Sequence, residues 1–406
     1  MFIYFFVFLL ILICVYTFDI KGKQINRGFW EIVIVVVLIL LAGLRNHVGS
    51  DSIAYEYTFN HSTPLLHDFL SIRDLNSIRE PLWALLMSLC KTVFGSFVFF
   101  QFVHAIILNT LLFRFYKKLT DKTFTALLIT FLVSWIGLNF EILRQSLCIA
   151  IYLNAILLLK DNKITSYILL SILMFGIHNF SVVLSIISPI ILFVNKKWLY
   201  PTLLLAALFV IFFVDVTFLN MMFLETEDFR NSFMQRQIDA YTNHDIYGYV
   251  NLNMNGIIRL TVLYVLFPLS LFRLNKDNYL SSVKKQKITL NIYIIQIEEF
   301  LNSFILLYMV FGLLSSKMVI FFRFQQYILP FVVVSSVIVF YKKQKKSLQT
   351  ACFFFYLLFM IFTIDAVVTL YNPSSSNSLE SYDTRYFPYT SVFQEPDPLR
   401  EKMWGK

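Results

Sequence analysis

The sequence predicts an all-α polytopic integral membrane protein, and three observations lead to this fold class. Hydrophobic residues make up 58% of the 406 positions and charged residues only 15%, which is more apolar surface than a soluble domain can bury. The apolar residues form long runs, and about 20 of them in a row suffice to span a bilayer as a helix. Basic residues recur in alternate loops between these runs, as they do in multi-pass proteins.

The apolar runs define about 12 transmembrane helices. The first run has no basic residues before it and no small-residue cleavage site after it, so we expect a retained helix. The spans are predicted at roughly 2–18, 29–44, 97–114, 123–139, 145–160, 165–178, 180–194, 199–216, 257–273, 300–316, 324–341 and 351–370.

We expect residues 1–370 to form a single transmembrane domain, with polar outer loops at about 45–96 and 217–256 and a polar tail at 371–406. Six loops hold well over half of the 34 Lys and Arg residues, and the positive-inside rule makes these loops cytoplasmic. Both termini, the two outer loops and the tail then lie outside. The six basic loops are at 21–27, 114–122, 160–163, 195–197, 273–287 and 341–346.

Arginine is concentrated on the predicted outer side, whereas lysine dominates the cytoplasmic loops. A guanidinium can donate to two phosphate or carboxylate oxygens at once, so an anionic ligand is expected outside. Three of these arginines lie at the ends of spans: Arg45 in GLRNHVGSD, Arg144 in NFEILRQS and Arg323 in FFRFQQY. The alternatives are that each anchors its helix at the lipid head groups, or that Arg144 pairs with Glu141 one turn earlier.

His178 lies at a turn between two apolar runs that are too short to cross the membrane. Lys163 and Lys196 both belong to predicted cytoplasmic loops, so the chain between them must go out and return. Two helices of about 14 residues reach about 21 Å each, less than the roughly 30 Å hydrocarbon core. The turn GIHNF should therefore be buried in protein or in a water-filled cavity, which makes His178 a functional candidate. The alternative is a neutral histidine that only closes the hairpin.

The segment REPLWALLMSLCKTVFGS, residues 79–96, is predicted to be a re-entrant or interfacial helix on the outer face. It is apolar, but the positions on both of its sides are predicted to be outside, so it has no crossing to make. Glu80 and Pro81 open this helix, because proline fits the first helical turn.

Several elements, in this order, resemble a known family. They are RNHVGSDSIAYEY at 45–57, REPLW at 79–83, LNFEILRQSLCIAI at 138–151, FGIHNFSVVL at 175–184 and a Tyr-rich YFPYTSVF at 386–393. Together they are similar to the EpsG-like group of Wzy-type polysaccharide polymerases, and the resemblance covers essentially the whole chain. It implies an enzyme of the bacterial cytoplasmic membrane that joins polyprenyl-pyrophosphate-linked oligosaccharide repeat units of O-antigen, capsule or exopolysaccharide on the outer face.

The resemblance implies a glycosyl transfer in which a lipid pyrophosphate leaves and a sugar hydroxyl attacks. Preorganised arginines stabilise the charge of such a leaving group, and a histidine that titrates near neutral pH can accept the proton. The predicted pyrophosphate ligands are Arg45, Arg144 and Arg323, and the candidate bases are His178, which is preferred, Asp51 and Glu80. The predicted sugar contacts are Tyr55, Glu141 and Gln145.

No cofactor is expected, and the first outer loop has no acidic doublet that would bind a metal ion, so we expect metal-independent catalysis. The resemblance implies membrane lipids, a chain-length regulator and a flippase as partners, and no nucleic acid. Two other functions fit the sequence: an O-antigen ligase or other lipid-donor glycosyltransferase, and a flippase or transporter of lipid-linked oligosaccharides. A flippase should place charge within spans that line a route, whereas this chain concentrates it at one face.

Overall fold

The computed structural model describes residues 2–71, 80–193, 196–213, 261–271, 288–315, 320–341, 386 and 389–395. Contacts divide the chain into two compact units, Met1–Ile187 with Ile364–Lys406 and Ser188–Thr363. Within the described ranges the regular elements are all helices, as predicted. The predicted outer loop 217–256, the predicted span 351–370 and most of the predicted tail lie outside the described residues.

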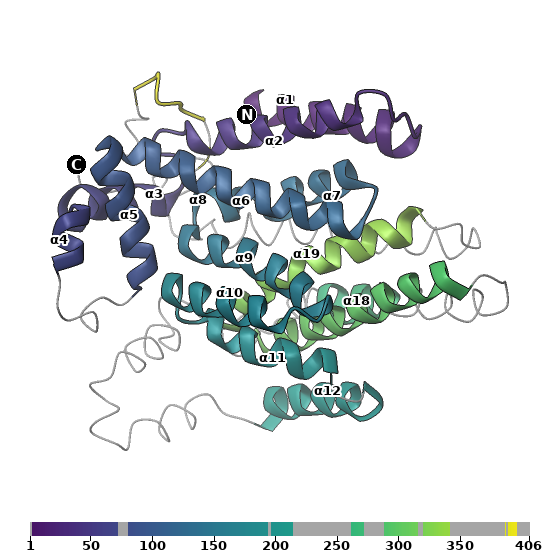
Figure 1. The fold of residues 1–406 in the computed structure, drawn as a ribbon. Coiled ribbons are helices and arrows are strands. Elements are labelled where there is room, and N and C mark those ends of the chain that lie inside the picture. Colours follow the sequence, from purple (N-terminus) through teal and green to yellow (C-terminus); the bar gives the residue numbers. More distant parts are fainter. Residues whose placement is uncertain are drawn as a thin grey trace, which may run out of the picture. The chain divides into compact units, whose positions relative to one another are not determined.

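In the first unit, long helices follow one another in antiparallel pairs. Neighbouring helices α2, α6, α9 and α10 pack in that order and run side by side (Figure 1). The elements of this unit are α1 (Phe2–Cys14), η1 (Val15–Ile20), α2 (Arg27–Gly43), α3 (Ser50–Tyr57), η2 (Thr58–Ser62), α4 (Leu66–Ser71), α5 (Pro81–Phe94), α6 (Phe97–Leu119), α7 (Thr123–Thr130), η4 (Phe131–Trp135), α8 (Ile136–Phe140), α9 (Leu143–Lys160) and α10 (Ile164–Ile177). The unit boundary falls within α11 (Ser181–Phe193).

In the second unit, the described elements are α12 (Lys196–Phe213), η5 (Val262–Leu266), α18 (Ile288–Leu314) and α19 (Ile320–Tyr341). α18 packs against α12 and α19, and the rings of Phe304 and Phe331 stack at 3.9 Å between α18 and α19. α18 starts well before position 300, where the sequence placed its start. The glutamate pair at 298–299 lies within this helix and does not interrupt it, because glutamate is a good helix former.

Among the residues that the structure describes, five helices are long and apolar enough to cross a membrane, and further apolar helices are shorter. The five are Phe2–Ile20, Phe97–Leu119, Thr123–Phe140, Leu143–Lys160 and Ile320–Tyr341. An all-α protein with several candidate spans is therefore confirmed. The number of 12 spans and the outside position of both termini stay predictions.

Two local predictions from the sequence are confirmed. The two short helices predicted on either side of His178 are α10 with 14 residues and α11 with 13, and His178 is buried at the break between them. The predicted helix that starts in REPLW is α5, which begins at Pro81 and ends at Phe94. Gly95 follows it with a φ of 64°, which suits a glycine. The interfacial or re-entrant placement of α5 stays a prediction.

At the other end of the first unit, an ion-pair cluster around Arg27 joins four helical segments. Its guanidinium pairs with Asp19 at 3.0 Å and with Glu31 at 3.2 Å, and it also donates to Thr123 Oγ1 at 3.1 Å. Lys117 of α6 adds a second ion pair to Glu31 at 2.6 Å. Because both carboxylates are almost fully buried, these charges need each other, and the cluster fixes the ends of η1, α2, α6 and α7.

Candidate functional site

Glu80 lies just before α5 and contacts residues at two other helix termini of the first unit. One carboxylate oxygen, Oε1, lies 2.9 Å from Nδ1 of His178, which follows α10. The other, Oε2, lies 2.5 Å from Nη1 of Arg144, in the first turn of α9. We call Glu80, Arg144, His178 and Tyr55 the Glu80 cluster. Three of the four lie where a helix begins or ends, so the helix packing, and not one local motif, assembles the site.

The Glu80 cluster is buried except at Arg144. The side chains of Glu80 and His178 are 4% and 7% exposed, while that of Arg144 is 34% exposed. Burial raises the pKa of Glu80, but the hydrogen bond from His178 and the charge of Arg144 outweigh burial, so the pKa is lowered overall. Glu80 is therefore a carboxylate at neutral pH, and Arg144 is the edge of the cluster that a ligand can reach.

The Glu80 carboxylate selects the tautomer of His178. A carboxylate can only accept hydrogen bonds, so Nδ1 of His178 must carry the proton that points at Oε1. In the neutral imidazole Nε2 then carries the free lone pair, and within the described part of the chain no group bonds to it. This arrangement is what a histidine base needs: one nitrogen held by a carboxylate and the other open to take a proton.

Tyr55 of α3 holds the other side of the Arg144 guanidinium. Nε of Arg144 donates to the Tyr55 hydroxyl at 3.3 Å, and the guanidinium lies 5.8 Å from the centre of the ring. The Tyr55 ring also packs edge-on against Trp83 of α5 at 5.7 Å. Burial raises the pKa of Tyr55, so its hydroxyl stays protonated. Tyr55 thus orients Arg144, and its predicted contact with sugar stays a prediction.

The break between α8 and α9 positions α3. Glu141 lies in this break, and its Oε2 accepts from the backbone N–H of Asp51, in the first turn of α3, at 3.1 Å. A carboxylate at a helix N-terminus satisfies N–H groups that have no partner within the helix. Gly49 makes the close approach possible, because its φ is 101° and a Cβ there would lie 2.6 Å from the carbonyl oxygen of Phe140. The side chain of Asp51 is exposed.

The C-terminal tail returns to this same break. The Tyr386 hydroxyl donates to Oε1 of Glu141, so that carboxylate links the tail to α3. Further along, the backbone of the tail forms an antiparallel bridge between Ser391 and Arg45, with Asn46 N to Thr390 O at 2.9 Å and Val392 N to Leu44 O at 2.9 Å. We call residues 386 and 389–395 the tail strap.

Arg45 lies beneath the tail strap and is fully buried, with 0% exposure. Its Nη1 donates to the carbonyl oxygen of Ala42, and its guanidinium lies 5.1 Å from the ring centre of Phe140. Nε and Nη2 have no hydrogen-bond partner among the described residues. Burial lowers the pKa of Arg45 to about 10, so the group is still a cation at neutral pH. In this conformation Arg45 is closed off from any ligand.

The remaining predicted residues lie elsewhere. Gln145 follows Arg144 on α9 and is 3% exposed. Arg323 belongs to the second unit, near the start of α19, and is partly buried. The structure thus brings Tyr55, Glu80, Arg144 and His178 together and places Arg45, Asp51 and Glu141 in the adjoining contacts of the α8–α9 break.

Two polar residues of α6 that the sequence analysis did not single out support these breaks. His104 Nε2 lies 2.9 Å from the carbonyl oxygen of Leu143, the residue before Arg144. Gln101, one turn earlier, lies 3.4 Å from the hydroxyl of Ser52 and donates to the carbonyl oxygen of Arg45 at 3.3 Å. The signal was present: two polar side chains three positions apart share a face of an otherwise apolar span.

Comparisons with known proteins and with family models identify the family of the chain. Neither a curated protein nor a solved structure matches the chain. A family model described as the EpsG family matches residues 28–391, which include all four members of the Glu80 cluster and reach into the tail strap. Because this match covers nearly the whole chain, the protein belongs to the EpsG family, which is associated with polysaccharide polymerases.

Proposed function

We propose that this protein is a polysaccharide polymerase that joins polyprenyl-pyrophosphate-linked oligosaccharide repeat units on the outer face of the bacterial cytoplasmic membrane. The observation that carries the proposal is the double contact of Glu80, with His178 on one oxygen and Arg144 on the other. This double contact holds a base, His178, and a cation, Arg144, next to each other. Glycosyl transfer from a lipid pyrophosphate needs a base for the acceptor hydroxyl and a cation for the leaving group. Family membership supports the polymer as product.

His178 is the proposed general base. A sugar hydroxyl of the acceptor places its proton on Nε2 as its oxygen forms the new bond to the anomeric carbon of the donor. The Glu80 carboxylate holds Nδ1–H and stabilises the imidazolium that results. Glu80 therefore acts through His178 as a positioning residue. His178 is the preferred base because its Nε2 is open to accept a proton.

Arg144 is the proposed ligand of the leaving group. The bond between the anomeric carbon and the pyrophosphate oxygen breaks, and its electron pair stays with the lipid pyrophosphate. Arg144 is already oriented by Glu80 and Tyr55 and is the exposed edge of the cluster, so it can stabilise that charge without rearranging. Charge stabilisation by arginine requires no metal ion, and we propose a metal-independent reaction.

Arg45 and Arg323 are proposed as further pyrophosphate ligands. Arg45 has two buried N–H groups without a partner in the described part, which is the state of a donor that lacks its acceptor. It would bind only after the tail strap moves aside. Glu141 and Gln145 remain proposed sugar contacts at the same break. Asp51, a candidate base in the sequence, is proposed as a further sugar contact because its side chain is exposed.

The proposal is tested with the purified full-length protein and a defined lipid-pyrophosphate-linked oligosaccharide in the presence of a metal chelator. A ladder of products separated by one repeat unit on a gel is the expected result, and the His178→Ala variant should form the ladder at a strongly reduced rate. A single transfer to another acceptor, without a ladder, would support a ligase instead. If the protein moved the intact lipid-linked unit across a liposome membrane without forming a new bond, the polymerase assignment would be wrong.

A further inference from the structure

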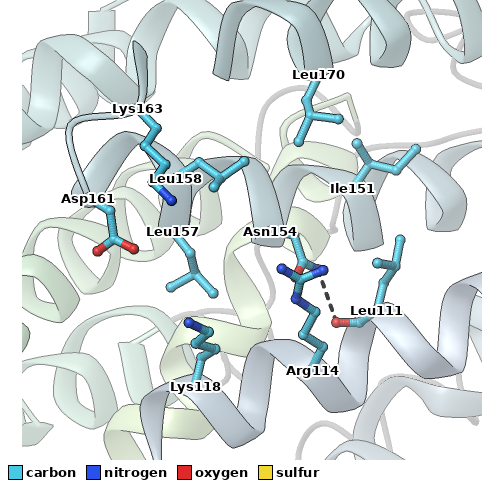
Figure 2. Close-up of a pocket in the computed structure, with 10 residues that line it drawn as sticks. All are labelled: Leu111, Arg114, Lys118, Ile151, Asn154, Leu157, Leu158, Asp161, Lys163 and Leu170. Atoms are coloured by element: carbon cyan, nitrogen blue, oxygen red, sulfur yellow. Dashed lines mark hydrogen bonds between the residues drawn. The ribbon is translucent and has the colours of Figure 1, made fainter. Parts of the chain in front are cut away.

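A second candidate binding site is a pocket lined by basic side chains at the opposite end of α9 from Arg144. It has a volume of about 260 Å³ and lies between α6, α9 and the start of α10 (Figure 2). Its lining residues on α9 lie roughly 10 to 21 Å along the helix from Arg144, so the pocket is separate from the Glu80 cluster. The charge pattern of the loops predicts this end to be cytoplasmic.

Three basic side chains face the pocket. Arg114 and Lys118 come from α6 and Lys163 from the turn before α10, and their charged ends point into the same space (Figure 2). In the part of the chain that the structure describes, none of the three side chains makes an ion pair or a hydrogen bond. Asp161 is the one acidic side chain among the lining residues, so the lining is positive overall.

Arg114 distinguishes this group from ordinary topological charges. Lysine is the usual basic residue of the predicted cytoplasmic loops, and Arg27, another arginine of these loops, is fully engaged with Asp19 and Glu31. Arg114 has no such carboxylate partner in the described ranges, although its planar fork suits two oxygens of a phosphate. One guanidinium and two ammonium groups face the same space, and none of them pairs with a carboxylate of the described chain. Such a group of cations is suited to bind an anionic ligand.

Apart from Asn154, whose amide donates to the carbonyl oxygen of Leu111 at 3.0 Å, the other walls of the pocket are apolar. They are formed by Leu111, Ile151, Leu157, Leu158 and Leu170. Leu170 lies between the exposed positions Leu169 and Leu173 on α10, where an exposed leucine in a membrane protein faces lipid chains. The volume is slightly below the roughly 300 to 1,000 Å³ of pockets that enclose a whole drug-sized ligand. A phosphate head group with its chains passing over α10 fits these walls better than a nucleotide does.

We propose that this pocket binds a phosphate-bearing anion, and that the source is the head group of an anionic phospholipid of the cytoplasmic leaflet. Basic pockets between membrane helices on this side are suited to anionic lipid head groups. Bound there, the lipid would bridge α6, α9 and α10 and so steady α9, whose first turn carries Arg144.

The test measures lipid binding to the full-length protein in detergent by native mass spectrometry. Short-chain phosphatidylglycerol is compared with phosphatidylcholine of the same chains and with inorganic phosphate. We expect saturable binding of phosphatidylglycerol alone. Equal binding of phosphatidylcholine would overturn the anion site, whereas binding of inorganic phosphate as tight as that of phosphatidylglycerol would keep the anion site and overturn the lipid source.

Variants locate the site. Arg114→Gln with Lys118→Gln should weaken phosphatidylglycerol binding about 25-fold, at roughly fivefold for each basic residue. The matched control, Lys21→Gln with Lys23→Gln, removes two exposed charges from the same predicted side and should leave the affinity unchanged. Equal losses in the two double variants would contradict the site. Asp161→Asn removes the repelling carboxylate and should tighten binding up to fivefold, and no tightening would also count against the proposal.

Discussion

Glu80 and His178, 98 positions apart in the chain, are joined by a hydrogen bond of 2.9 Å in which the imidazole donates from Nδ1. Both residues were candidate bases in the sequence. The hydrogen bond indicates that they act together, with the carboxylate orienting the imidazole and the imidazole accepting the proton. The carboxylate is held ionised by Arg144 and His178, which makes it a poor proton acceptor and a good orienting group. Nε2 of the imidazole stays available to accept the proton of the acceptor hydroxyl.

The first prediction separates these tasks. His178→Ala should reduce the initial rate of polymer formation by about 10²-fold to 10⁴-fold, because it removes the base. Glu80→Gln should reduce the rate by about 10²-fold or more, because an amide fixes neither the tautomer nor the guanidinium as a carboxylate does. The measurement is the initial rate per amount of protein in the membrane.

A second carboxylate–histidine pair provides the control. His67 and Asp68 also lie 2.9 Å apart, but their side chains are 76% and 56% exposed and lie outside the Glu80 cluster. Asp68→Asn should therefore leave the rate unchanged. If Glu80→Gln behaved like Asp68→Asn, the orienting role of Glu80 would be refuted.

The second prediction concerns the shape of Arg144. Arg144→Lys keeps the charge but cannot donate to Glu80 and Tyr55 at once in the geometry of the guanidinium. The rate should fall about 10²-fold to 10³-fold, in the range for loss of an oriented charge-stabilising donor. Tyr55→Phe removes only the long contact of 3.3 Å and should cost less than about tenfold. A near-normal rate of polymer formation by Arg144→Lys would refute the assignment of Arg144 as the ligand of the leaving group.

The third prediction uses the lowered pKa of Glu80. A carboxyl whose folded-state pKa lies below its ordinary value of 4.5 stabilises the fold above that pH. The stabilisation is lost as the pH falls through the folded-state pKa. The unfolding temperature of the protein in detergent should therefore fall more steeply below pH 4.5 than that of Glu80→Gln, which has no proton to take up. Parallel curves for the two proteins would show that Glu80 does not couple protonation to folding.

The fourth prediction tests the Arg27 cluster as a purely structural device. Arg27→Ala leaves the carboxylates of Asp19 and Glu31 buried with fewer partners, and unpairing buried charges costs about 3 to 5 kcal/mol. A clear fall in the unfolding temperature is expected. Lys21→Ala, at an exposed position nearby, is the control and should leave it unchanged. A similar unfolding temperature for both variants would mean that Lys117 and the hydroxyl groups compensate.

The helices could be predicted from the sequence because apolar runs and loop charges are local signals. The position of His178 at a buried turn followed from the basic loops on either side and from lengths: the two runs between those loops are too short to span a bilayer, and α10 and α11 have those lengths. The start of α5 at Pro81 followed from proline's preference for the first turn.

The partners of these residues could not be predicted, because they depend on how helices pack. Nothing local indicates that Glu80 rather than Glu141 pairs with Arg144, since a glutamate three positions away was equally available. Arg45 shows the same limit. The sequence predicted it to be a ligand at the end of a span. Its side chain is instead buried against Phe140, and its backbone forms a bridge to Ser391 in the distant tail, which no periodicity reveals.

The fifth prediction concerns this tail strap. Tyr386→Phe removes the hydroxyl that donates to Glu141 and should loosen the strap, because an oxygen of a buried carboxylate loses a donor at a cost of about 1 to 3 kcal/mol. Protease cleavage in the tail should become faster in the folded protein, and Arg45 should become accessible to an arginine-specific reagent. Phe393→Ala, at a position 83% exposed, is the control and should change neither.

The same variant distinguishes two roles of the tail strap. If Arg45 binds pyrophosphate only after the strap moves, Tyr386→Phe should lower KM for the lipid-linked donor while it leaves kcat within a few fold, because opening no longer competes with binding. If the strap instead builds the site through Glu141 and α3, the variant should lower kcat, since the N-terminus of α3 and with it Tyr55 would lose their support. An unchanged KM together with a strongly reduced kcat would therefore refute opening of the strap and favour a fixed tail.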